Sequence, residues 1–118
     1  MKDKIAYIET SDKKYPICFN LNVMEEIQEK YGTMADWGDI VENEGGEPKI
    51  KELKDGLLAM INEAIDIENE NKTEKMQLLT HKQVGRIIGE VGLNAVLDKV
   101  KSLTIESTKV EETESKNE

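Results

Sequence analysis

The chain has 118 residues, of which 37% are hydrophobic, 35% charged and only 4% aromatic, so we expect one domain with a lean, aliphatic core. Its formal net charge of −9 argues against binding to nucleic acid or to an anionic membrane surface, because carboxylates repel phosphate groups. The single cysteine excludes an internal disulfide. No window approaches the ~18 apolar residues of a membrane span, and the N-terminus does not resemble a signal peptide, so we expect a cytoplasmic protein.

A β-hairpin is predicted over residues 4–19. Its two halves are rich in β-branched and aromatic residues, and the polar segment 10–14 lies between them. Pro16 cannot donate a hydrogen bond to a neighbouring strand, so the second half should be an edge strand. Because a lone hairpin is only marginally stable in water, one of its faces must pack on helices.

Two helices follow, over about residues 23–31 and 34–42. Asn22 is the expected N-cap of the first, with Glu25 at capping-box spacing, and Gly32 is its expected end. Thr33 and Asp36 have the same spacing at the start of the second. The apolar residues of this second helix recur at helical spacing; they are Met34, Trp37, Ile40 and Val41.

The strongest helical periodicity runs over residues 49–67 and predicts the central helix of the domain. Gly56 lowers the helix propensity there by about 1 kcal/mol relative to alanine, and it could let a neighbouring element approach closely. Two further helices are predicted over residues 81–91 and 94–104. The first has Thr80 and Gln83 as a capping box and Gly92 at its end, and Asn94 is the expected cap of the second.

These elements predict a mainly α (α+β) fold: an N-terminal β-hairpin packed on a bundle of four to five helices. Residues 1–105 should form the single domain. The acidic tail, residues 106–118, has too little apolar content to offset its ordering entropy, so we expect it to be disordered.

No set of residues in the sequence predicts catalysis, and we expect neither an enzyme nor a bound cofactor or metal. His81, the only histidine, falls at the start of a predicted helix and should be an ordinary solvated residue. Cys18 lies in an apolar strand and should be a small buried thiol. No Cys or His pair has metal-ligand spacing. Gly85, Gly89 and Gly92 share a helix face, which indicates a smooth groove for a neighbouring element, either internal or from a partner.

The apolar face of the short predicted helix has two interpretations. It can be a lid that covers the core of the domain, or it can be a patch that binds a partner, since Trp and Met are favoured at such sites. We carry the second interpretation forward as the candidate partner-binding set, which consists of Met34, Trp37, Ile40 and Val41.

The order of the elements is more informative than any one motif. A hairpin is followed by Phe19-Asn20-Leu21-Asn22-Val23-Met24-Glu25-Glu26-Ile27-Gln28-Glu29-Lys30-Tyr31-Gly32, a short segment with Trp37, a leucine-rich helix from Leu53 to Ile65, and Leu79-Thr80-His81-Lys82-Gln83-Val84-Gly85-Arg86-Ile87-Ile88-Gly89. Over roughly residues 5–104, this order resembles the small tail assembly chaperones of long-tailed phages and prophages of Gram-positive bacteria.

The resemblance implies a protein without catalytic residues that binds the tape-measure protein, a long helical chain, and keeps it soluble during tail assembly. It also implies the tail-tube protein as a second candidate partner, a location in the host cytoplasm, and absence from the mature virion. Two alternatives stay open. One is an acidic inhibitor or antitoxin-like regulator of a basic partner, and the other is a minor structural virion protein. The sequence predicts no oligomeric state.

Overall fold

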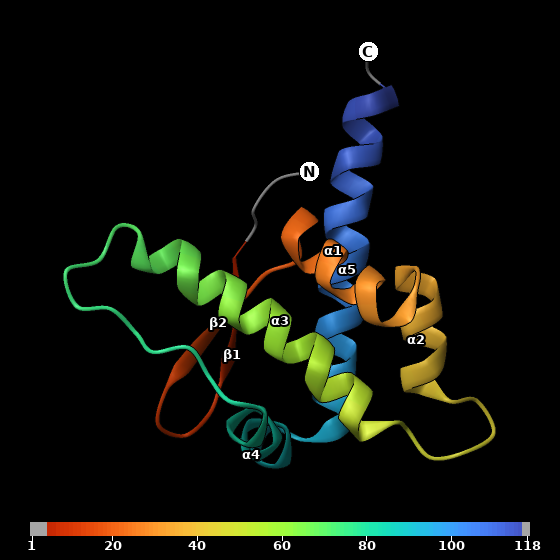
Figure 1. Cartoon of the computed structure of the whole chain (residues 1–118), viewed down its shortest axis with the longest axis horizontal. Helices are drawn as coiled ribbons and strands as arrows, with labels where there is room; N and C mark the ends of the chain where they lie inside the picture. Colours follow the sequence, from red (N-terminus) through yellow and green to blue (C-terminus); the bar gives the residue numbers. More distant parts are fainter. Residues whose placement is uncertain (1–4, 117–118) are drawn as a thin grey trace.

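The computed structural model describes residues 5–116, and it describes side chains as far as Glu106. An antiparallel hairpin is followed by five helices (Figure 1), which confirms the predicted fold class. The elements are β1 (Ala6–Glu9), β2 (Lys14–Ile17), α1 (Leu21–Tyr31), α2 (Met34–Glu42), α3 (Ile50–Asn69), α4 (His81–Val91) and α5 (Leu93–Lys116).

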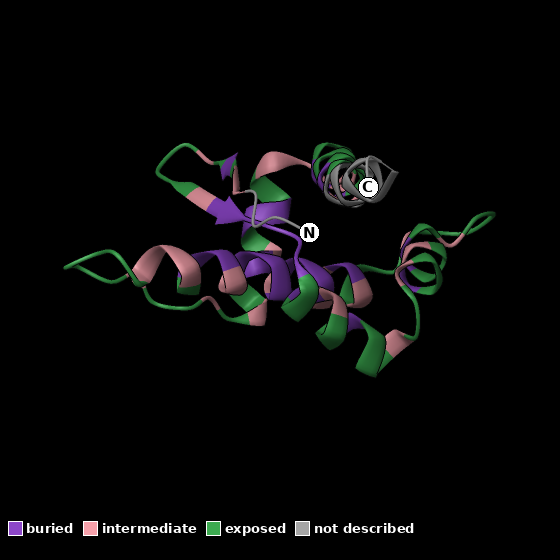
Figure 2. Ribbon diagram, turned by 90° about the horizontal axis from the view of Figure 1, so that it is seen from above, coloured by how far each residue is buried: buried purple, intermediate pink, exposed green. Residues whose placement is uncertain are grey.

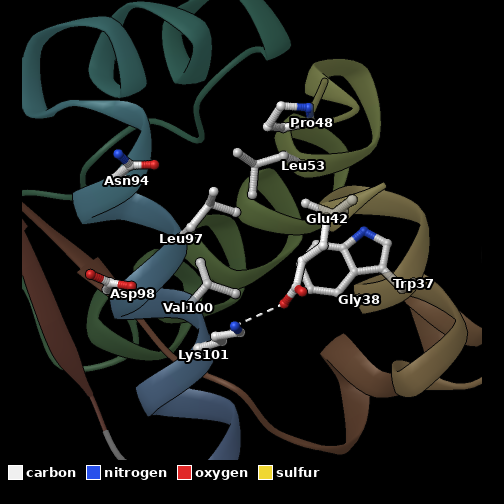
Figure 3. Close-up of a pocket in the computed structure, with 11 residues that line it drawn as sticks. Trp37, Gly38, Glu42, Pro48, Leu53, Asn94, Leu97, Asp98, Val100 and Lys101 are labelled. Carbon is white, nitrogen blue, oxygen red and sulfur yellow. Dashed lines mark ion pairs between the residues drawn. The ribbon is translucent and has the colours of Figure 1, made fainter. Parts of the chain in front are cut away.

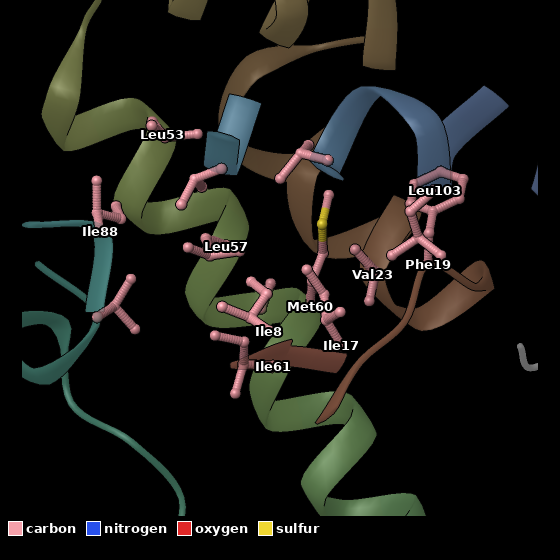
Figure 4. Close-up of a cluster of buried hydrophobic side chains, with 14 of the residues drawn as sticks. Ile8, Ile17, Phe19, Val23, Leu53, Leu57, Met60, Ile61, Ile88 and Leu103 are labelled. Atoms are coloured by element: carbon pink, nitrogen blue, oxygen red, sulfur yellow. The ribbon is translucent and has the colours of Figure 1, made fainter. Parts of the chain in front are cut away.

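Helix α3 is the centre of the fold, because β2, α1, α2 and α4 all pack against it. Its middle is buried, whereas α1 and α2 expose one side to solvent (Figure 2). Side chains from the hairpin and from α1, α3, α4 and α5 meet in one core (Figure 4), which includes Ile8, Ile17, Phe19, Val23, Leu57, Met60, Ile61, Ile88 and Leu103.

The hairpin is attached to α3 by its backbone as well as by its side chains. Ala6 pairs with Ile17 and Ile8 pairs with Tyr15 in the antiparallel register. Directly after β2, the backbone N–H of Cys18 donates to the carbonyl oxygen of Met60 in α3 at 3.2 Å. This packing on a helix provides the support that a two-stranded sheet needs.

The start of α1 differs from the prediction. Asn20, not Asn22, is the N-cap: its side-chain oxygen accepts from the backbone N–H of Val23 at 3.1 Å, and the helix begins at Leu21. Phe19, directly before it, is fully buried, and Asn20 itself is only 6% exposed. Asn22 instead lies in the first turn of the helix and donates to the Glu63 carboxylate of α3.

The other helix boundaries agree with the sequence, with two exceptions. Both predicted capping boxes, at Thr33 and Thr80, are present. Helix α5 begins at Leu93, because the carbonyl of Gly92 accepts from the backbone N–H of Val96 at 3.1 Å; Asn94 is therefore not its cap. The helix also continues past the predicted end at residue 104. The predicted disorder of residues 106–118 lies almost wholly outside the described side chains and stays a prediction.

Candidate functional site

The main candidate site is an apolar cleft between α2, the start of α3 and the first half of α5 (Figure 3). Its volume is about 510 Å³, within the range of pockets that bind ligands in proteins. Residues from all three helices and from the loop before α3 line it: Trp37, Gly38, Val41, Glu42, Pro48, Leu53, Asn94, Leu97, Asp98, Val100 and Lys101.

Trp37 forms a fixed wall of the cleft. Its indole lies over Gly56 of α3, where a β-carbon would overlap the ring. The indole Nε1 donates to the backbone carbonyl of Glu52 at 2.9 Å. Gly56 therefore lets α2 approach α3 closely, as its position in the sequence indicated.

The structure divides the predicted partner-binding face. Trp37 and Val41 are buried, with only 4% and 3% of their surfaces exposed, and both line the cleft. Met34 is half-buried against the core, and Ile40 is 37% exposed and does not line the cleft. Trp37 and Val41 thus cover part of the core and also wall a cavity.

Sequence reasoning missed the α5 side of the cleft. Leu97 and Val100 belong to the apolar stripe of the predicted last helix, but the sequence gives no sign that this stripe faces α2. Gly38 was missed as well: it lines the cleft, and a β-carbon there would meet no atom within 4 Å. The cleft consequently has room at Gly38 for a side chain that the chain itself does not supply.

An ion pair lies at the rim of the cleft. The Nζ of Lys101 lies 2.9 Å from a carboxylate oxygen of Glu42, and both side chains are more than half exposed. The hydrogen bond to Glu42 and the charge of Glu42 raise the pKa of Lys101 above its usual value, and Asp98 adds to this effect. Solvent screens such a pair, so it stabilises the fold little and a charged partner can displace it.

A second group of polar side chains surrounds Asp55 in α3. Its carboxylate accepts from the hydroxyl of Tyr31 at 2.5 Å and from Lys51 at 3.2 Å, and it lies 2.8 Å from Nε2 of His81. His81 was predicted to be an ordinary solvated residue; its side chain is 38% exposed, and its pairing with Asp55 of α3 is a contact that the sequence did not indicate. Proximity in sequence could not reveal this, because 26 residues separate the pair.

The pKa shifts in this group follow from burial and hydrogen bonding. Burial acts to raise the pKa of Asp55, but the hydrogen bonds from Tyr31, Lys51 and His81 outweigh it and leave that pKa below its ordinary value. Burial and the bond to Asp55 raise the pKa of Tyr31 well above its usual range. The group links α1, α3 and α4 around one carboxylate, so its evident effect is structural.

The remaining candidate residues form no further site. Cys18 is fully buried, as predicted. Of the three glycines on α4 and its end, only Gly85 has a close neighbour, the side chain of Lys54; at Gly89 and Gly92 the adjoining space is open. Within the described part of the chain, no group of three or more His, Cys, Asp or Glu could hold a metal ion. In that same part, every helix is too short or too polar to cross a membrane.

The chain matches no protein-family model, and neither a curated protein nor a solved structure shows significant similarity to it. The interpretation of the cleft therefore depends on its own geometry and chemistry.

Proposed function

We propose that the protein is a tail assembly chaperone of a long-tailed phage, which binds the tape-measure protein and keeps it soluble in the host cytoplasm until the tail tube assembles. The observation that carries this proposal is the apolar cleft between α2 and α5. An amphipathic helix that enters such a cleft buries its apolar side chains in the way common to helix-in-groove recognition.

The shape and the lining of the cleft suit bulky side chains of a helix. Leu53, Leu97 and Val100 provide aliphatic walls, and the indole of Trp37 provides a flat aromatic one. The open space beside Gly38 can take an anchor residue of the partner. Anchors of this kind, buried in a pocket, contribute most of the binding energy at protein interfaces.

The charge of the chain suits a protein that holds an aggregation-prone partner in solution. A tape-measure chain carries long apolar helical stripes, and these associate unless they are covered. The net charge of −9 would keep the complex soluble through mutual repulsion of its copies. The exposed ion pair between Glu42 and Lys101 can open at little free-energy cost when the partner docks.

Co-expression tests this proposal. The tape-measure protein is expressed with the wild-type chain, with Gly38→Leu, which fills the cleft, or with Gly89→Leu, a matched change at an α4 position that also has open space. We expect the wild type and Gly89→Leu to keep the tape-measure protein in the soluble fraction and Gly38→Leu to lose most of this effect. Equal solubility with and without the wild-type chain would refute the proposal. Mass spectrometry of purified virions should find the chain absent.

A further inference from the structure

A second groove runs between α1 and the C-terminal half of α3. Its volume is about 370 Å³. Val23, Leu58 and Ala59 give it an apolar floor, and none of the residues that line it is a lysine or an arginine. Its polar lining consists of two asparagines and three carboxylates, namely Asn22, Asn62, Glu26, Glu63 and Asp66.

One of the three carboxylates is held in place. The side-chain amides of Asn20 and Asn22 both donate to Oε2 of Glu63, at 2.8 and 2.9 Å. Asn20 is itself buried and caps α1 through its side-chain oxygen. The position of Glu63 is thus coupled to the start of α1, and a cation that binds there meets a carboxylate that needs little reorganisation.

An apolar side chain stands at the rim of the same groove. Leu78, in the connection between α3 and α4, lines the groove and is 56% exposed. Its position is fixed through the next residue, because the side chain of Asn62 makes two hydrogen bonds with the backbone of Leu79, at 2.8 and 3.1 Å. Leu78 is therefore kept exposed to solvent beside a groove that has an apolar floor and an acidic lining.

We propose that this groove binds a basic amphipathic segment of a partner protein. Apolar side chains of the segment pack on Leu78 and Leu58, and its lysines or arginines pair with Glu26, Glu63 and Asp66. The charge complementarity identifies the occupant. An apolar floor alone would accept many segments, whereas three carboxylates in a lining that contains no lysine or arginine favour a cationic one. The groove is separate from the α2–α5 cleft, so this inference stands independently of the proposed chaperone function.

The test uses the full chain and a synthetic helical probe peptide with leucines on one face and lysines on the other. Binding is measured by fluorescence anisotropy of a labelled peptide. The variant carries Glu26→Lys with Asp66→Lys. The matched control carries Glu25→Lys, on the same helix α1, with Glu70→Lys, at the C-cap of α3; neither control position lines the groove. Both double variants change the net charge equally.

We expect the double variant in the groove to weaken peptide binding about tenfold or more and the control variant to weaken it much less. Equal weakening, or no binding to the wild type, would overturn the proposal.

A second pair of variants tests the apolar contact. Leu78→Ser should weaken binding of the probe peptide. Leu21→Ser, at an exposed leucine that does not line the groove, should leave this binding unchanged. Gly38→Leu, which fills the other cleft, should leave peptide binding unchanged. If Gly38→Leu weakens peptide binding and Leu78→Ser does not, the peptide occupies the α2–α5 cleft instead, and the inference about this groove is wrong.

Discussion

The indole of Trp37 rests on the α-carbon of Gly56, at a point where no side chain fits between α2 and α3. This contact sets the separation of the two helices, and the indole nitrogen fixes the ring through the carbonyl of Glu52. The same ring forms one wall of the candidate binding cleft. The geometry of the cleft thus depends on a glycine in the middle of the central helix.

Gly56→Ala tests this dependence. Alanine favours a helix by about 1 kcal/mol over glycine, but its methyl group would overlap Trp37 and force the two helices apart. We expect the free energy of unfolding to fall by about 1–3 kcal/mol, as overpacking of a core typically does. Urea unfolding measures it. Gly89→Ala, where nothing lies within 4 Å, is the control and should be neutral or stabilising. Equal stabilisation by both changes would contradict the contact.

Asp55→Asn should make the stability of the protein less dependent on acid pH. Because the folded pKa of Asp55 lies below its ordinary value, the carboxylate stabilises the fold above about pH 4 and loses this effect as the pH falls through the folded pKa. The variant should be less stable than the wild type at neutral pH by about 1–3 kcal/mol, and the difference should shrink in acid.

Urea unfolding at a series of pH values measures both effects of Asp55→Asn. Asp39→Asn, at an exposed aspartate of α2, should retain the wild-type pH profile and serves as the control. A constant difference between Asp55→Asn and the wild type at every pH would show that the charge of Asp55 does not stabilise the fold.

Asn20 and Asn22 should differ in their contribution to stability. Asn20→Ala removes the cap of α1 and a part-buried hydrogen bond to Glu63, and it should lower the free energy of unfolding by about 1–2 kcal/mol. Asn22→Ala removes one exposed hydrogen bond and should change it by less than about 0.5 kcal/mol. Chemical denaturation compares the two. If the larger loss came from Asn22→Ala, the helix would begin after residue 22.

Local sequence signals predicted the elements of this fold well. Capping boxes at Thr33 and Thr80 and glycines after α1 and α4 mark helix ends through contacts made within a few residues. The errors at Asn22 and Asn94 arose where another residue two positions earlier could also begin the helix. Asn20 caps α1, and the carbonyl of Gly92 accepts the first helical hydrogen bond of α5.

The candidate sites could be predicted only in part. Trp37 and Val41 were identified from their helical spacing, and both line the cleft. Their partners on α5 and the pairing of His81 with Asp55 depend on how helices far apart in the sequence pack. The position of Leu78 likewise depends on Asn62 of α3, whose side chain accepts a hydrogen bond from the backbone of the next residue, Leu79. Periodicity shows which face of a helix is apolar, but not which element covers it.

The emission of Trp37, the only tryptophan, reports most directly on the central claim that the α2–α5 cleft binds a helix of the tape-measure protein. Tryptophan-free helical peptides from that protein are titrated into the wild type, Gly38→Leu and Gly89→Leu, and Trp37 fluorescence is followed to saturation. The account predicts a saturable change with the wild type and with Gly89→Leu, and its loss with Gly38→Leu. The same saturable change in all three proteins would contradict it.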